Sequence, residues 1–158
     1  MLKRFVKYYR PHLKLFIIDM VCALAISLID LIFPYATNKV LRELIPNQAI
    51  RAVFIIGGIL LIIYVIRFIL SYIIGYWGHT MGIRIETDMR TDLFHQFQIL
   101  DYQFYDDKKT GELMTNLTTH LHDVSEMSHH APEDLFISFI MLVGSFILLS
   151  TINFLLTI

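Results

Sequence analysis

Residues 51–100 read RAVFIIGGILLIIYVIRFILSYIIGYWGHTMGIRIETDMRTDLFHQFQIL and contain no proline. Within this stretch, residues 52–77 are mostly apolar with Arg67 as the only charge, whereas the residues after them alternate charged with apolar side chains. A helix of this length would reach about 75 Å, and crossing the hydrocarbon of a bilayer takes only about 30 Å. The sequence therefore predicts one long helix that crosses a membrane and continues about 40 Å into water.

The composition favours a membrane protein. The chain has 158 residues, of which 56% are hydrophobic and 17% charged, whereas an average soluble domain is about 45 to 50% apolar and about 25% charged. The 13 basic and 14 acidic residues give a net charge of -1, which argues against nucleic acid as the main partner. Cys22 is the only cysteine, so the chain has neither an internal disulfide nor a multi-cysteine metal site.

Two further apolar runs, residues 15–35 and 135–158, have about the length that a membrane-spanning helix needs. We therefore predict an all-α membrane protein with three transmembrane helices and long cytoplasmic helical extensions. The expected segments are an elbow helix (1–12), span 1 (13–37), span 2 with its extension (51–100), a short connecting helix (101–109), a return helix (110–133) and span 3 (134–158).

Two other interpretations of the apolar runs are less favoured. A soluble helical bundle would alternate polar and apolar faces, but residues 137–149 carry polar side chains only at Ser138 and Ser145. A cleaved signal peptide over residues 1–25 would have Asp19 inside its apolar core, and the apolar run continues past the cleavage site.

Basic residues before the first span indicate its orientation. Cytoplasmic flanks are enriched in lysine and arginine, and five such residues precede the span: Lys3, Arg4, Lys7, Arg10 and Lys14. We expect a multi-pass protein of the cell membrane with a cytoplasmic N-terminus, which places residues 78–134 in the cytoplasm. Lys39, Arg42 and Arg51, in the outer link, count against this orientation.

The connecting segment, residues 101–109, combines aromatic and charged side chains at the point expected to lie farthest from the lipid. Aromatic anchors surrounded by polar groups suit a protein interface, so we predict that Phe104 and Tyr105 contact a partner protein. Alternatively, both aromatics only cap the ends of the flanking helices. After this segment Thr110 is the expected N-cap of the return helix, with Glu112 in its first turn.

The order of motifs in this region resembles the first intracellular loop of ATP-binding cassette (ABC) exporters with six spans per subunit. The motifs are Arg90 with Leu93 and Phe94, then Phe104-Tyr105-Asp106, then residues 109–113, Lys-Thr-Gly-Glu-Leu. The resemblance covers essentially the whole chain, including Arg10-Pro11 before span 1 and Pro34 near its outer end. Relatives commonly have arginine where Asn116 stands and aspartate where His120 stands.

The resemblance implies that residues 101–109 form a coupling helix seated in a nucleotide-binding domain that hydrolyses ATP with Mg²⁺. The implied partners are the lipid bilayer, that domain and a second transmembrane half. The residues expected to bind the domain are Gln103, Phe104, Tyr105, Asp106, Lys109, Gly111 and Glu112. The chain has no phosphate-binding loop and no expected cofactor of its own, so we interpret it as an N-terminal fragment of the transmembrane domain, without a catalytic site.

Two other functions remain open: a stand-alone three-span adaptor protein, and a membrane metalloenzyme built on the histidines. His120, His122, His129 and His130 form a histidine-rich stretch with Glu126. They lack the His-Glu-x-x-His arrangement of zinc proteases, so we expect interfacial polar residues and no metal site.

Three charged residues lie within the spans, where a charge is costly and usually faces protein, a partner charge or water. Asp19 and Arg67 have matching estimated depths of about 7 to 8 Å from the inner lipid edge, which predicts an interhelical ion pair. Independent snorkelling to the inner interface and contact with substrate are the alternatives. Asp30 lies on a possible substrate path, or reaches Arg51 or Lys39 at the outer surface.

Overall fold

The computed structural model describes residues 2–106 and 109–157, with side chains for residues 5–106, 109–151 and 154. The described residues form helices and turns, and they include no strand. The elements are α1 (Leu2–Lys7), η1 (Arg10–His12), α2 (Leu13–Lys39), η2 (Val40–Leu44), α3 (Ile50–Ile99), α4 (Tyr102–Asp106), α5 (Thr110–Thr115), η3 (Asn116–His120) and α6 (Leu121–Thr157).

Three helical stretches are long and apolar enough to cross a membrane: Phe5–Leu44, Ile50–Ile99 and Thr110–Thr151. The predicted fold class, an all-α membrane protein with three spans, is thereby confirmed. The chain divides into two compact units, each built from more than one segment. Unit 1 comprises Met1–Asp19 and Tyr76–Pro132, and unit 2 comprises Met20–Gly75 and Glu133–Ile158.

Unit 2 contains the apolar parts of α2, α3 and α6. A turn around Pro46 joins α2 and η2 to α3, and Gln48 there adopts a left-handed backbone with φ 54. The core of unit 2 consists of Cys22, Ala23, Ile26 and Ile74, with Leu70, Ile73, Phe136 and Ile137 packed against it. Most other large apolar side chains of this unit are exposed, among them Phe54 at 78% and Phe68 at 73%. Such an exposed apolar surface suits a lipid environment.

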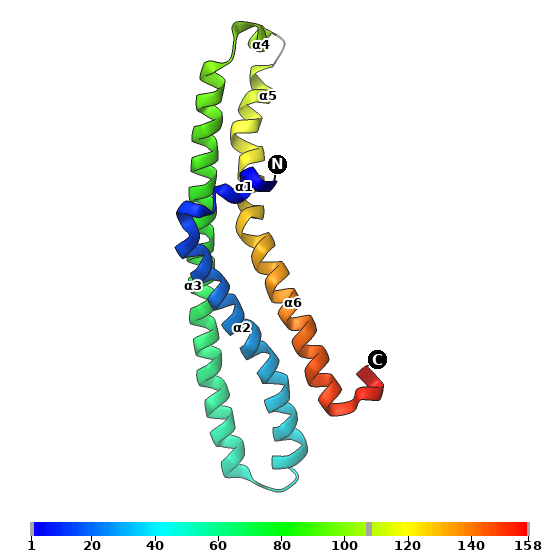
Figure 1. Ribbon diagram of the computed structural model, residues 1–158. Helices are drawn as coiled ribbons and strands as arrows, with labels where there is room; N and C mark the ends of the chain where they lie inside the picture. The colour runs from blue at the N-terminus through cyan, green and yellow to red at the C-terminus, as the bar shows by residue number, and fades with distance from the viewer. Residues whose placement is uncertain (1, 107–108, 158) are drawn as a thin grey trace. The chain divides into compact units, whose positions relative to one another are not determined.

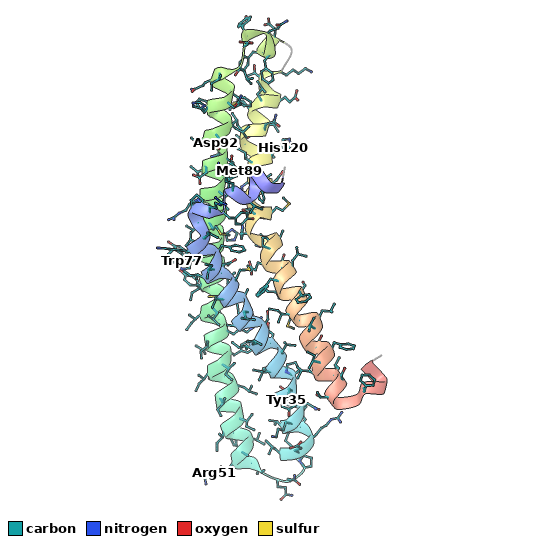
Figure 2. The ribbon with its side chains drawn as sticks, viewed as in Figure 1. Tyr35, Arg51, Trp77, Met89, Asp92 and His120 are labelled. Atoms are coloured by element: carbon teal, nitrogen blue, oxygen red, sulfur yellow. The ribbon has the colours of Figure 1, made fainter. Side chains whose placement is uncertain are left out.

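Unit 1 contains the N-terminal segment, the second half of α3, and α4, α5, η3 and the start of α6 (Figure 1). Its core consists of Leu15, Met81 and Ile85, with Tyr8, Tyr9, Phe16 and Met89 packed against it. Figure 2 marks Met89 and Asp92 on the part of α3 that the N-terminal segment contacts. The N-terminal segment is therefore an integral part of this unit.

The N-terminal segment makes polar contacts with two other helices of unit 1. The Tyr8 hydroxyl donates to Asp92 Oδ2 at 2.7 Å, and His12 Nε2 lies 2.9 Å from Asp88 Oδ2, both on α3. The Tyr9 hydroxyl donates to the backbone carbonyl of Ser128 on α6. Where the sequence predicts a single elbow helix over residues 1–12, the structure has α1, a turn at residues 8–9 and η1.

The start of the return helix differs from the expectation in two details. Lys109, with ψ 127, is the N-cap of α5, whereas the sequence predicted Thr110. No side chain caps this end; the amides of Glu112 and Leu113 bond to the Lys109 carbonyl. Farther along, a π-helical turn at η3 interrupts the regular helix between Asn116 and His120, the two positions that depart from the pattern of the resembling family.

Candidate functional site

The connection between α3 and α5 carries the predicted partner-binding residues. It contains α4, a helix of five residues none of which is buried. Figure 1 shows α4 at the far end of the hairpin that α3 and α5 form within unit 1. A hydrogen bond of 3.0 Å from the Phe104 amide to the Asp101 carbonyl closes its first turn. The chain therefore reverses direction through a short, accessible helix.

The aromatic residues of α4 are divided between packing and exposure. Phe104 is half-buried and lines a groove together with Leu93 and Phe97 of α3. The Tyr105 hydroxyl donates to the Phe97 carbonyl, which ties α4 to the end of α3. Tyr102, by contrast, is 81% exposed.

This division refines the sequence-based expectation, which placed both Phe104 and Tyr105 in a partner interface. The two rings meet edge to face with centroids 5.4 Å apart, and the hydrogen bond from Tyr105 to the Phe97 carbonyl fixes the position of α4. Sequence reasoning missed Tyr102 as the protruding aromatic. A local pattern does not reveal which face of so short a helix folds back on its neighbour.

The other predicted partner-binding residues lie next to this aromatic group along the chain, and all of them are exposed. Exposed side chains or backbone are found at Gln103, Asp106, Lys109, Gly111 and Glu112. A Cβ atom built on Gly111 would meet nothing within 4 Å, so this backbone is open to approach. The structure thus brings the seven predicted residues together on α4 and the start of α5. Asp107 and Lys108, within the predicted connecting helix, lie outside the described residues.

Residues 16–158 match the family model described as the ABC transporter transmembrane region. The chain belongs to this family. It is 41% identical over 97% of its length to the ABC transporter ATP-binding protein YwjA of Bacillus subtilis. It is also 27% identical over 82% of its length to the ATP-dependent lipid A-core flippase of Idiomarina loihiensis, and 25% identical over 99% to ABC transporter B family member 1 of Dictyostelium discoideum.

This ABC transporter chain spans only part of the length of those relatives: 27% of the Bacillus protein, 22% of the Idiomarina protein and 17% of the Dictyostelium protein. Because the match covers the transmembrane region, the chain is a membrane protein. The adaptor and metalloenzyme alternatives are not favoured.

The charged residues of unit 2 pair differently from the prediction. Arg67 Nε and one terminal nitrogen donate to the two carboxylate oxygens of Asp30 at 2.6 and 2.9 Å. The Arg67 guanidinium also lies 5.6 Å from the centre of the Tyr64 ring. The prediction that Arg67 pairs with Asp19 is therefore wrong, and so is the assignment of Asp30 to Arg51 or Lys39.

The reason lies in how α2 and α3 align. The sequence-based depths of Asp19 and Arg67 were each measured from a lipid edge and left out the turn that joins α2 to α3. This turn sets which residues of the two antiparallel helices lie opposite each other. Asp30 lies eleven residues after Asp19, and Arg67 lies eleven residues before Gly78. In unit 1, Asp19 contacts the position of Gly78, with Oδ1 3.4 Å from a Cβ built there. Asp19 therefore lies opposite Gly78 within unit 1, and Asp30 lies opposite Arg67 within unit 2.

A second group of ionisable side chains lies in unit 1. His79 of α3 and Glu126, His129 and His130 of α6 each offer a ligand atom, and these atoms all lie within 4.8 Å of one another. His129 is buried, with only 2% of its surface exposed. Sequence reasoning grouped His129 and His130 with Glu126 but missed His79, which lies about fifty residues earlier on another helix.

Arg90, a residue of the resembling motif, links α3 to the π-helical turn. Its Nε donates to the Leu117 carbonyl at 3.1 Å, and a terminal nitrogen pairs with Glu86. A π-helical turn changes the pattern of backbone hydrogen bonds, and here a side chain binds one of its carbonyls. Arg90 thus positions the return helix on α3.

Proposed function

We propose that this chain is part of an ATP-driven exporter and that α4 couples it to a nucleotide-binding domain. The observation that carries the proposal is the accessible aromatic helix α4 at the end of a long, uninterrupted α3 in a chain of the ABC transporter family. ATP and Mg²⁺ would bind in the nucleotide-binding domain. The chain itself would contribute contact residues and no reacting group.

Tyr102 is the side chain most suited to enter a pocket of that domain. Exposed aromatic residues are enriched among the few interface residues that dominate binding energy, and Tyr102 is 81% exposed. Phe104 and Tyr105 would hold α4 rigid against α3, because Tyr105 donates a hydrogen bond to the Phe97 carbonyl and Phe104 lines a groove together with Phe97. Gln103, Asp106, Lys109, Gly111 and Glu112 would form the polar rim.

The mechanism follows from the continuity of α3. This helix runs for 50 residues from Ile50 to Ile99 without an interruption, so a displacement of α4 is transmitted along one hydrogen-bonded backbone. Closure of two nucleotide-binding domains on ATP would move α4, and the spans would reorient between inward and outward access together with those of a second transmembrane half. The basic N-terminal flank supports a cytoplasmic position for the N-terminus and for α4.

The test measures ATP hydrolysis and transport in the intact protein after reconstitution into vesicles. A labelled lipid is the first substrate to examine, because the similar Idiomarina protein is named an ATP-dependent lipid A-core flippase. We expect Tyr102→Ala to abolish the stimulation of transport by ATP while the protein still inserts and folds. His95→Ala, at an exposed position on α3, is the matched control and should leave transport unchanged. Equal ATP-driven transport in Tyr102→Ala and in the unsubstituted protein would refute the coupling role.

A further inference from the structure

Three imidazoles and one carboxylate meet between α3 and α6 of unit 1. His79 Nδ1 lies 3.8 Å from Glu126 Oε1, and His130 Nε2 lies 3.6 Å from Glu126 Oε2. The ring centroids of His79 and His129 are 4.6 Å apart, and those of His129 and His130 are 4.0 Å apart. All four residues belong to the same unit, so this geometry is internal to it.

These separations suit ligands that share one ion. Zinc binds imidazole nitrogen and carboxylate oxygen at about 2.0 to 2.2 Å, so two ligands of a tetrahedral site stand about 3.3 to 3.6 Å apart. The two nitrogen–oxygen distances, each to a different carboxylate oxygen of Glu126, are 3.8 and 3.6 Å, and single ligand atoms from all four residues lie within 4.8 Å of one another. Rotation of the exposed His79 and His130 side chains would close the difference from that tetrahedral spacing.

His129 supplies an independent observation. Its side chain is only 2% exposed, and its Nε2 atom is buried without a hydrogen-bond partner. Buried polar atoms are nearly always satisfied, so an unsatisfied one calls for an explanation such as an ion. His129 Nδ1 lies 3.4 Å from the Ser125 carbonyl. An Nδ1–H that donates there leaves the lone pair on Nε2, which is the arrangement that metal-binding histidines adopt.

Gly82 and Gly78 allow this histidine to lie against α3. A Cβ on Gly82 would stand 3.1 Å from His129 Nδ1 and 3.2 Å from Ser125 Oγ, and one on Gly78 would stand 3.3 Å from His129 Cδ2. Any larger residue at either position would push α6 or the ring outward. The two glycines thus create the space in which the His129 ring approaches His79.

We propose that His79, Glu126, His129 and His130 bind a divalent transition metal, with zinc as the expected ion, and that this metal fastens α3 to α6. Imidazole and carboxylate ligands suit zinc and its neighbours in the first transition series. Four protein ligands complete a tetrahedral zinc site and leave no open position for a reacting water. The site is therefore structural or regulatory, and its occupancy controls how firmly the two helices are held together.

Metal binding is measured on the intact protein in detergent after removal of metals with a chelator. Co²⁺ is the probe, because its visible absorption reports tetrahedral coordination, and Zn²⁺ is then titrated in competition. We expect one ion per chain. His79→Ala and His130→Ala should weaken binding at least about 100-fold, because even outer-shell partners of a metal site account for about 10 to 100-fold.

The controls separate loss of a ligand from loss of structure. His79 and His130 have side chains 53% and 49% exposed, so their replacement leaves the core intact. His95→Ala removes another exposed histidine of α3 and should bind the metal as the unsubstituted protein does. Glu126→Gln keeps the shape of the side chain and should also weaken binding.

Hydrogen exchange gives a second readout. Zinc should slow amide exchange in residues 76–82 and 126–132 of the unsubstituted protein, because a ligand that binds only the folded state suppresses local opening. The same addition should have no effect in His79→Ala. Absence of Co²⁺ and Zn²⁺ binding, or equal affinities in His79→Ala and His95→Ala, would overturn the proposal. Neither readout depends on ATP hydrolysis, so the coupling role of α4 is tested separately.

Discussion

The Tyr9 hydroxyl donates a hydrogen bond to the backbone carbonyl of Ser128. Pro132 stands four residues after Ser128 inside α6 and has no N–H, so the helix cannot satisfy this carbonyl by its own ladder. The N-terminal segment thus supplies the hydrogen bond that a proline removes from α6.

Tyr9→Phe should lower the free energy of unfolding of the protein by about 1 to 3 kcal/mol, because it leaves a buried acceptor without a donor. In a Pro132→Ala background residue 132 has its own N–H, so the same substitution should cost much less. Thermal or denaturant unfolding of the four proteins of this double-mutant cycle measures the difference. Tyr35→Phe, at an exposed tyrosine of α2, is the control. If Tyr9→Phe lowered the free energy of unfolding equally in the unsubstituted and the Pro132→Ala backgrounds, Pro132 would not be the reason for the hydrogen bond from Tyr9 to Ser128.

The effects of substituting Asp30 and Arg67 on stability should be coupled, because the two side chains form an ion pair within the membrane. Asp30→Asn or Arg67→Gln alone leaves a single charge in the hydrocarbon, which costs about 2.5 to 3.5 kcal/mol on insertion scales. The double substitution leaves none and should recover most of the lost stability. Yield and thermal stability in detergent measure the effect. Asp19→Asn combined with Arg67→Gln should give no such recovery, and recovery there would restore the Asp19 pairing.

Gly82 should tolerate no larger residue. Gly82→Ala places a methyl group against His129 Nδ1 and Ser125 Oγ, at 3.1 and 3.2 Å, and overpacking of this kind costs about 1 to 3 kcal/mol. Gly75→Ala meets nothing within 4 Å and should be neutral or stabilising, because alanine favours a helix over glycine by about 1 kcal/mol. Thermal unfolding of both variants distinguishes these outcomes. Equal effects would mean that α6 is not closely packed at Gly82.

The local features of this chain could be predicted from sequence, and the tertiary ones only in part. The long α3 follows from periodicity and from the absence of proline, which are properties of neighbouring residues. Predicting the partner of Arg67 requires the antiparallel alignment of α2 and α3, which the turn near Pro46 sets. An estimate of the depth of each residue in the lipid does not contain this alignment. The exposure of Tyr102 and the half-burial of Phe104 depend on how α4 folds back on Phe97.

The histidine cluster depended on tertiary structure in the same way. The sequence of residues 126–130 reveals only three members of the cluster. The fourth member, His79, is brought to them by the packing of α3 on α6. The π-helical turn at Asn116–His120 has no sequence signature that we recognise. These features arise from the pairing of helices, which a single sequence does not specify.

The most direct test of the coupling role is cross-linking from Tyr102. Tyr102→Cys is introduced into an intact protein whose other cysteines, Cys22 included, are replaced by serine, and a short photoactivatable reagent is attached to it in membranes. Ile83→Cys, also exposed but on α3 instead of α4, is the control. Mass spectrometry should identify cross-links from residue 102 to a nucleotide-binding domain, with none from residue 83. Cross-links from residue 102 only to lipid or to its own helices α3 and α5 would contradict the account.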